Sequence, residues 1–220
     1  MEDPLPAATT LLLALALALL YALFLLWYGG RGRPLSTAER EAMLAELAQR
    51  AAGEDAAEQV AAVRALVAED DGREFMMHNL VRWRERAAYD SAGPYGHLNG
   101  SDPRAADRRY GRLIGPELLK RGCVPVFIAP RSGRFMEHAA EPVWDYVALV
   151  RYRSKRDFLR FALAIERSGI VQHKWAAIAQ TRIFPVRPLL SLVMVRLTLA
   201  AVLVALWLVL ATAARLVGWA

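Results

Sequence analysis

The chain has 220 residues, 55% of them hydrophobic, and a formal net charge of +6, which fits one or two folded domains. Cys123 is the only cysteine, so an internal disulfide is excluded and a reducing compartment is favoured. Attraction to an anionic membrane surface accounts for the basic excess, and we expect no nucleic-acid partner.

An apolar run without a charged residue occupies residues 7–28. As a helix it would be about 33 Å long at about 1.5 Å per residue, enough to cross a hydrocarbon core of about 30 Å. The acidic N-terminus, and the aromatic residues Trp27 and Tyr28 at the end of the run, are unlike a cleaved signal peptide. The run therefore predicts an uncleaved transmembrane helix.

Two amphipathic helices are expected next. Ser36 and Glu39 form a capping box, which starts the first helix. Gly53 breaks it, and apolar residues then continue the 3.6-residue period to about Ala68. Turn residues at 70–72 close the second helix.

Alternating side chains predict a strand in "EFMMHNLVRW", residues 74–83. Because successive side chains of a strand point to opposite faces, one face carries Phe75, Met77, Asn79, Val81 and Trp83. A long loop is expected at residues 88–103, followed by a helix at 105–121 that ends at Gly122.

The rest of the middle predicts three more strands and one long helix. The strands are expected at residues 123–130, with a resumption at 134–138, at 143–153 and at 181–186. The helix is capped by Ser154 and runs to about residue 179, with an interruption near Gly169. The order βαββαβ predicts an α+β fold of the ferredoxin-like type.

A second apolar run, residues 197–214, lies between Arg196 and Arg215 and predicts a second transmembrane helix. Arginines flank both runs on the side of the middle domain, which by the positive-inside rule places that domain in the cytoplasm. We therefore expect a two-pass protein of the inner (cytoplasmic) membrane, with both termini outside and the lipid bilayer as a partner.

These expectations divide the chain into seven parts. They are an extracytoplasmic N-terminus at 1–6, a transmembrane helix at 7–28, a linker with amphipathic helices at 29–69, a ferredoxin-like cytoplasmic domain at 70–187, an interfacial segment at 188–196, a transmembrane helix at 197–214 and an extracytoplasmic C-terminus at 215–220.

Four segments of the middle resemble the domain-of-unknown-function family 1330. They are "DDGREFMMHNLVRW", "YGRLIGPELLKRG", "WDYVALVRYRSKRDF" and "HKWAAI", within residues 70–186. The resemblance implies a ferredoxin-like subunit that pairs with a copy of itself into a dimeric α+β barrel. That superfamily includes cofactor-free monooxygenases, muconolactone isomerase and chlorite dismutase, so the fold alone does not select a reaction.

The resemblance also suggests site residues. Met77 and Asn79 match the family's Met-x-Asn, and Tyr110 matches its helix tyrosine. Arg156 stands near the family's Ser-Arg, displaced by one residue, and His173 begins the pair that is often His-Arg in the family. These five residues are the candidates for ligand binding.

The chemistry of the candidates leaves alternatives open. The Asn79 amide, on an otherwise apolar strand face, needs a hydrogen bond either to a ligand or within the fold. His173 and Tyr110 are candidate catalytic residues, although His173 on a helix is more often a surface residue. His78, His97 and His138 lack metal-site spacing, so we expect no metal, and nothing in the sequence implies a cofactor.

Three functions remain compatible with the sequence. The first is an accessory or assembly subunit of a larger membrane complex, favoured because two anchors add packing surface. The second is a membrane-tethered enzyme of the monooxygenase or isomerase kind, and the third is a ligand-binding sensor, each acting on a small apolar compound. The expected protein partner is a second copy of the chain or another subunit of a membrane complex.

Overall fold

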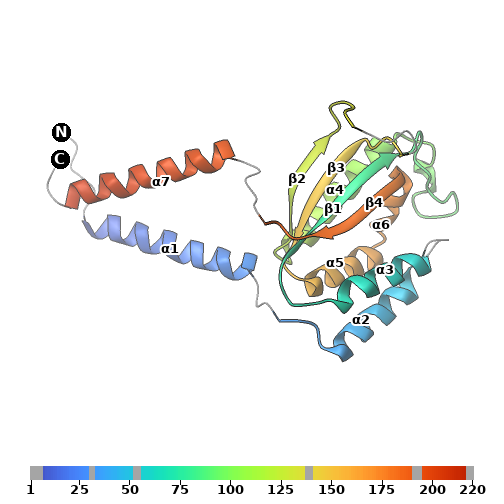
Figure 1. The fold of residues 1–220 in the computed structure, drawn as a ribbon, viewed down its shortest axis with the longest axis horizontal. Helices are drawn as coiled ribbons and strands as arrows, with labels where there is room; N and C mark the ends of the chain where they lie inside the picture. Colours follow the sequence, from blue (N-terminus) through green and yellow to red (C-terminus); the bar gives the residue numbers. More distant parts are fainter. Residues whose placement is uncertain (1–6, 30–32, 52–55, 137–140, 190–194, 217–220) are drawn as a thin grey trace. The chain divides into compact units, whose positions relative to one another are not determined.

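The computed structural model describes residues 7–29, 33–51, 56–136, 141–189 and 195–216 (Figure 1). The chain divides into two compact units, residues 1–187 and 188–220. The elements in order are α1 (Ala7–Gly29), α2 (Thr37–Arg50), α3 (Ala56–Ala68), β1 (Phe75–Trp83), the 3₁₀ turn Gly96–Leu98, α4 (Pro103–Leu119), β2 (Val124–Pro130), β3 (Tyr146–Tyr152), α5 (Lys155–Arg167), α6 (Val171–Ala177), β4 (Ile178–Val186) and α7 (Val195–Leu216).

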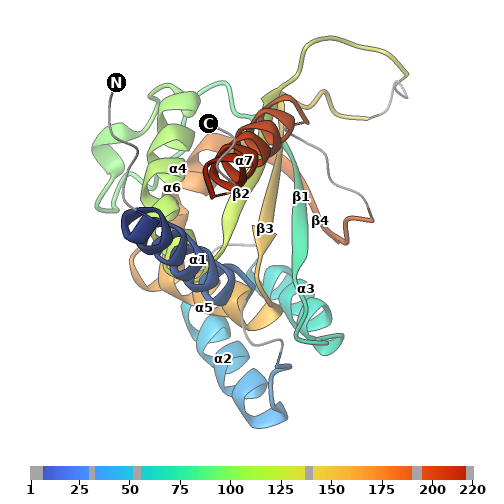
Figure 2. The same ribbon diagram turned by 90° about the vertical axis from the view of Figure 1, so that its left-hand side faces the viewer.

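The centre of the first unit is a four-stranded antiparallel sheet in the order β2-β3-β1-β4 (Figure 2). β1 lies between β3 and β4, and Asn79 pairs with Ala148 on one side and Ile183 on the other. Helix α4 connects β1 to β2, and α5 with α6 connects β3 to β4, so the chain passes through the sheet in the order βαββαβ. The fold is α+β.

The alternation of β1 separates a packed face from an open one. Phe75, Met77 and Val81 are buried toward the helices, and Phe75 stacks on Tyr152 of β3 with ring centroids 5.5 Å apart. The opposite face carries the partly buried side chains Met76, His78 and Leu80. The homodimer implied by the family resemblance would use this face, and it stays a prediction.

Local capping signals fix the helices that lie over the packed face. Asp102 accepts a hydrogen bond from the Arg104 amide at the start of α4, and the Ser154 hydroxyl accepts one from the Asp157 amide at the start of α5. Gly169, at φ 70°, takes the left-handed conformation that separates α5 from α6. The predicted interruption near Gly169 is therefore a true break between two helices.

The helical hairpin α2–α3 packs on α5, held by ion pairs across the contact. Arg156 Nη1 lies 2.6 Å from Glu39 Oε1, and Arg167 Nη2 lies 2.6 Å from Glu46 Oε2. Leu44 of α2, Val67 of α3 and Leu159 of α5 form a fully buried cluster beneath these pairs. The hairpin is thus an integral part of the helical layer.

Arg151 of β3 connects the end of α1, the residue before β1 and the turn between α4 and β2. It is 2% exposed, and its guanidinium donates hydrogen bonds to Glu74 (2.7 Å from Nε), to the Gly122 carbonyl (2.9 Å) and to the Tyr28 carbonyl (3.0 Å). Arg153 donates to the neighbouring carbonyl, that of Trp27. Because the last carbonyls of a helix have no partner within it, these two cations stabilise the C-terminal end of α1.

The prediction of two transmembrane helices is overturned. Both runs do form helices, α1 and α7, but among the residues that the structure describes no helix is long and apolar enough to cross a membrane. On this finding the predictions of spans at 7–28 and 197–214, of a two-pass topology and of an inner-membrane location are wrong.

Some predicted features fall on residues outside the described ranges. They are the N-terminal segment 1–6, the helix break at Gly53, most of the interfacial segment 188–196, the end of the C-terminal segment 215–220 and part of the resumed strand at 134–138. The described part of that resumption, up to Met136, is not a strand.

Candidate functional site

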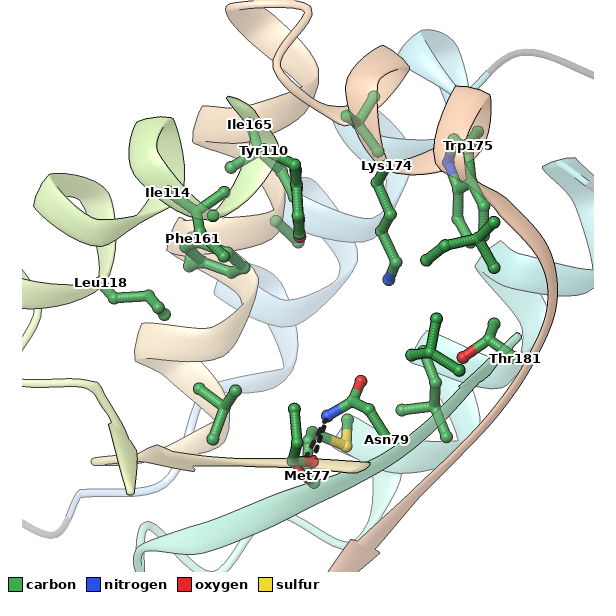
Figure 3. Close-up of a pocket in the computed structure, with 18 of the residues that line it drawn as sticks. Met77, Asn79, Tyr110, Ile114, Leu118, Phe161, Ile165, Lys174, Trp175 and Thr181 are labelled. Atoms are coloured by element: carbon green, nitrogen blue, oxygen red, sulfur yellow. Dashed lines mark hydrogen bonds between the residues drawn. The ribbon is translucent and has the colours of Figure 1, made fainter. Parts of the chain in front are cut away.

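A cavity of about 630 Å³ lies between the packed face of the sheet and the helices above it (Figure 3). Its walls come from all four strands and from helices α3, α4, α5 and α6. Most lining side chains are apolar, among them Met77, Ile114, Phe161 and Ile165. The volume and the lining are typical of a site for a small organic ligand.

Two glycines on α4 help to keep this space open. Residues of α4 at helical spacing line the cavity, and Gly111 and Gly115 are part of that stripe. A Cβ atom added at either glycine would meet no atom within 4 Å. The helix therefore presents bare backbone where larger side chains would fill the cavity.

The sheet side of the cavity presents hydrogen-bond acceptors. The Asn79 amide nitrogen donates to the carbonyls of Met77 (3.0 Å) and Ala148 (3.2 Å), which fixes the orientation of the amide and leaves its oxygen pointing into the cavity (Figure 3). Thr181 donates its hydroxyl proton to the Leu80 carbonyl, 2.9 Å away. The oxygens of Asn79 and Thr181 are therefore available to accept from a ligand.

The helix side presents donors. Lys174 of α6 points its ammonium toward Asn79 across the cavity, and Tyr110 of α4 lies beside it (Figure 3). The Lys174 Nζ atom lies 4.7 Å from the centroid of the Trp175 ring and 6.0 Å from that of Tyr110. No described residue accepts a hydrogen bond from this ammonium. Burial lowers the pKa of Lys174 to about 8, against the opposing charges of Asp107 and Glu166.

Carboxyl groups border the same space. Asp107 is held by Trp83 Nε1 (3.0 Å) and the Tyr146 hydroxyl (3.2 Å). Burial raises the pKa of Glu166, and burial followed by the charges of Asp107 and Glu166 raises that of Tyr110. Tyr110 therefore stays neutral and acts as a donor, so it is a poor general base. Within the described ranges, no cluster of three or more His, Cys, Asp or Glu residues is arranged to hold a metal ion.

The structure separates the five predicted ligand-binding residues. Met77, Asn79 and Tyr110 line the cavity together. Arg156 does not line it, because its guanidinium binds Glu39 and the Pro34 carbonyl on the far side of α5. His173 does not line it either.

His173 is buried, which corrects the expectation of a surface residue. It is 3% exposed, its Nδ1 lies 2.8 Å from the Tyr89 hydroxyl, and its ring contacts Tyr95 with centroids 4.4 Å apart. It therefore attaches the loop after β1 to α6. Burial and the nearby charge of Arg109 lower the pKa of His173.

The burial of His173 predicts a loss of stability in acid. As the pH falls below about 6.5, the unfolded chain takes up a proton that the folded His173 resists, so the free energy of unfolding decreases. In His173→Gln this loss of stability in acid should be absent. His97 is exposed in the loop after β1, so His97→Gln should show the same loss as the unchanged protein. Urea unfolding at pH 8 and pH 5 measures both, and an equal pH dependence of His173→Gln and the unchanged protein would contradict the prediction.

Lys174 and Thr181 are the cavity residues that the sequence did not single out. Lys174 is the second residue of the pair that begins with His173, and it is a lysine where the resemblance implies an arginine. Its spacing with Trp175 and His173 on one short helix gave no sign of which of them faces the sheet.

Comparison with known proteins supports the fold and leaves the chemistry open. No family model and no curated protein matches the chain. The crystal structure of a protein of unknown function from Rhodopseudomonas palustris is similar, with 28% identity and a TM-score of 0.51, over 61% of this chain and 94% of that one. The methylated form of that protein matches equally, with 28% identity and a TM-score of 0.51, over 60% and 91%.

Proposed function

We propose that the ferredoxin-like domain binds a small, largely apolar and uncharged organic molecule in the cavity between sheet and helices. The observation that carries this proposal is the arrangement of polar atoms across an otherwise apolar space. Lys174 and Tyr110 offer donors from the helices, and Asn79 and Thr181 offer acceptors from the sheet.

This arrangement favours a ligand whose polar end both accepts and donates, such as a carbonyl or hydroxyl group. A carboxylate would be attracted by the Lys174 ammonium, but it would also lie close to the acceptor oxygens of Asn79 and Thr181 and to the carboxyl groups of Asp107 and Glu166. An uncharged oxygen avoids that repulsion and still accepts hydrogen bonds from the partly buried donors of Lys174 and Tyr110.

The cavity supports the enzyme or sensor interpretation over the accessory subunit. A subunit that serves only to hold others in place has no need of a ligand-sized space with a partly buried amine, because filling that space with apolar side chains would add stability. The membrane attachment on which the accessory role depended is also without support.

A binding experiment with a matched pair of variants tests the proposal. Ala162 lines the cavity on α5, whereas Ala164 on the same helix does not. We expect 2-naphthalenemethanol to bind the full chain in isothermal titration calorimetry. Ala162→Phe should fill the cavity and weaken binding at least tenfold, or by about 1.4 kcal/mol, while Ala164→Phe should leave it unchanged.

Circular dichroism and thermal unfolding would verify that both variants are folded. An absence of binding to the unchanged protein, or an equal weakening by the two substitutions, would show that this cavity is not the site.

A further inference from the structure

Lysine is scarce in this chain, and one of its lysines lies in the cavity without a hydrogen-bond partner among the described residues. The sequence has 28 Lys and Arg residues, of which only Lys120, Lys155 and Lys174 are lysines. Lys120 pairs with Glu117 at 2.6 Å, and Lys155 donates to the Glu69 carbonyl. Among the described residues, nothing accepts a hydrogen bond from Lys174. Lysine differs from arginine in one chemical respect that matters here, because it can lose its proton and become a nucleophile.

The surroundings of Lys174 favour the neutral amine. Its Nζ lies 4.7 Å from the centroid of the Trp175 ring and 6.0 Å from that of Tyr110, and most of the other lining side chains are apolar. The ionisable groups that line the cavity with it are Asp107, Arg108 and Tyr110 on α4, Glu166 on α5, and Tyr146 and Tyr152 on β3. Burial outweighs the carboxylate charges, so the pKa of Lys174 falls to about 8, while burial raises the pKa of Glu166. Both members of this amine and carboxyl pair are shifted toward their uncharged forms.

We propose that Lys174 condenses with the carbonyl carbon of an aldehyde or ketone held in the cavity, forming an imine. This inference rests on the proposed function and names the substrate class of the same site. The acceptors on the sheet side suit it, because the intermediate carbinolamine carries a hydroxyl that can donate to Asn79. An activated, desolvated lysine is a known means of covalent catalysis on carbonyl compounds.

The step balances without a further reactant. The neutral Nζ forms a bond to the carbonyl carbon, the electron pair of the C=O bond moves to oxygen, and one of the two nitrogen protons passes to that oxygen to give the carbinolamine. The carbinolamine hydroxyl then leaves as water with a proton, for which the Glu166 carboxyl is the nearby donor on α5. As the C=N bond forms, the last nitrogen proton passes to the Glu166 carboxylate and restores its carboxyl form. The sum is amine plus carbonyl to imine plus water.

Reductive trapping on the full chain tests the inference. The protein is incubated with 2-naphthaldehyde and sodium cyanoborohydride, which reduces an imine to a stable secondary amine, and the adduct is located by peptide mass mapping. We expect an adduct on Lys174 at least tenfold more abundant than on Lys120, Lys155 or the α-amino group. Lys174→Arg should lose this adduct, and Lys120→Arg, at an exposed ion pair, should retain it.

The pH dependence provides a second measurement that needs no variant. The trapping rate at Lys174 should rise with pH around a midpoint near 8, rather than near the 10.5 of an ordinary lysine. Labelling spread evenly over the three lysines, or a midpoint near 10.5, would overturn the inference.

The two proposals fail in distinguishable ways. If 2-naphthalenemethanol binds but 2-naphthaldehyde leaves no adduct on Lys174, the imine is wrong and the binding site stands. If the alcohol does not bind and Lys174 is not labelled, both are wrong. Labelling of Lys174 that Ala162→Phe abolishes and Ala164→Phe preserves would support both.

Discussion

Replacing Lys174 with methionine should make the ligand-free protein more stable, by up to about 3 kcal/mol at pH 7. The pKa of Lys174 falls from 10.5 to about 8 on folding, and each unit corresponds to about 1.4 kcal/mol of preference for the neutral form. At pH 7 both the folded and the unfolded chain carry the ammonium, so the full cost of burying it is present. Methionine keeps the length and apolar contacts of the side chain without that cost.

The lowered pKa of Lys174 also predicts the pH range over which the stability advantage of Lys174→Met changes. Between about pH 8 and pH 10.5 the folded chain has lost the Lys174 proton while the unfolded chain still holds it, so the stability of the unchanged protein rises with pH relative to the variant. The advantage of Lys174→Met should therefore shrink across this window and vanish above it. Urea unfolding at pH 7, 9 and 10.5 measures the difference in unfolding free energy between the two proteins. Contributions from the other titrating groups are the same in both proteins and drop out of this difference.

Lys120→Met is the matched control for this measurement. Lys120 is exposed and pairs with Glu117 on the surface of α4, so its replacement should change stability by no more than about 0.5 kcal/mol at any of these pH values. If Lys174→Met destabilised the protein at pH 7, the ammonium would have to be well solvated or paired, and the cavity would have lost its distinctive donor.

Arg151→Ala should have the opposite effect and destabilise the protein by about 3 kcal/mol or more. The substitution removes a 2% exposed guanidinium that satisfies the Gly122 and Tyr28 carbonyls and the Glu74 carboxylate at once. Breaking a buried charged network by deleting one partner typically costs about 3 to 5 kcal/mol, because the remaining groups stay buried and unpaired. Guanidinium chloride unfolding of the full chain measures this loss.

Glu74→Gln distinguishes the contribution of the Arg151–Glu74 ion pair to stability from that of the two carbonyl contacts of Arg151. The Glu74 side chain is 52% exposed, so its charge contributes only about 0 to 1 kcal/mol, and the amide can still accept a hydrogen bond from Arg151. A cost of Arg151→Ala no larger than that of Glu74→Gln would mean that the two carbonyl contacts contribute nothing to stability.

Arg151 is buried and Lys174 is partly buried, and the two cations have opposite predicted effects because only Arg151 has hydrogen-bond partners among the described residues. Arg151 has three oxygen partners, which repay its desolvation. Lys174 has none among the described residues and therefore lowers the stability of the empty protein. A destabilising polar group that points into a cavity is typical of a binding or catalytic site, where a ligand supplies the missing partner.

Local sequence signals predicted the elements of the middle of the chain well. The capping residues Ser36 and Ser154 lie at helix starts, as expected, and both hydroxyls accept the predicted backbone hydrogen bonds. The alternation in β1 correctly assigned Met77 and Asn79 to one face. These signals depend only on residues close together in the sequence, so they can be recognised without knowledge of the rest of the fold.

Prediction failed where a residue's partner is distant in sequence. Arg156 was expected at a ligand site, but Glu39, 117 residues away, holds it outside the cavity. The apolar terminal runs predicted membrane spans, and among the described residues no helix is long and apolar enough to cross a membrane. Gly111 and Gly115 border open space in the cavity, and that space exists only when the facing strands are in place.

The sequence by itself determined the order of helices and strands, the inward face of β1 and the scarcity of lysine. Only the tertiary structure decided that His173 and Lys174 have different environments. Neighbours on a helix differ by about 100° around its axis, so one short helix directs His173 into the loop after β1 and Lys174 into the cavity. Which direction meets the loop and which meets the cavity depends on how α6 packs against α4 and β4. That packing is the result of contacts between segments far apart in the chain, and no local pattern encodes it.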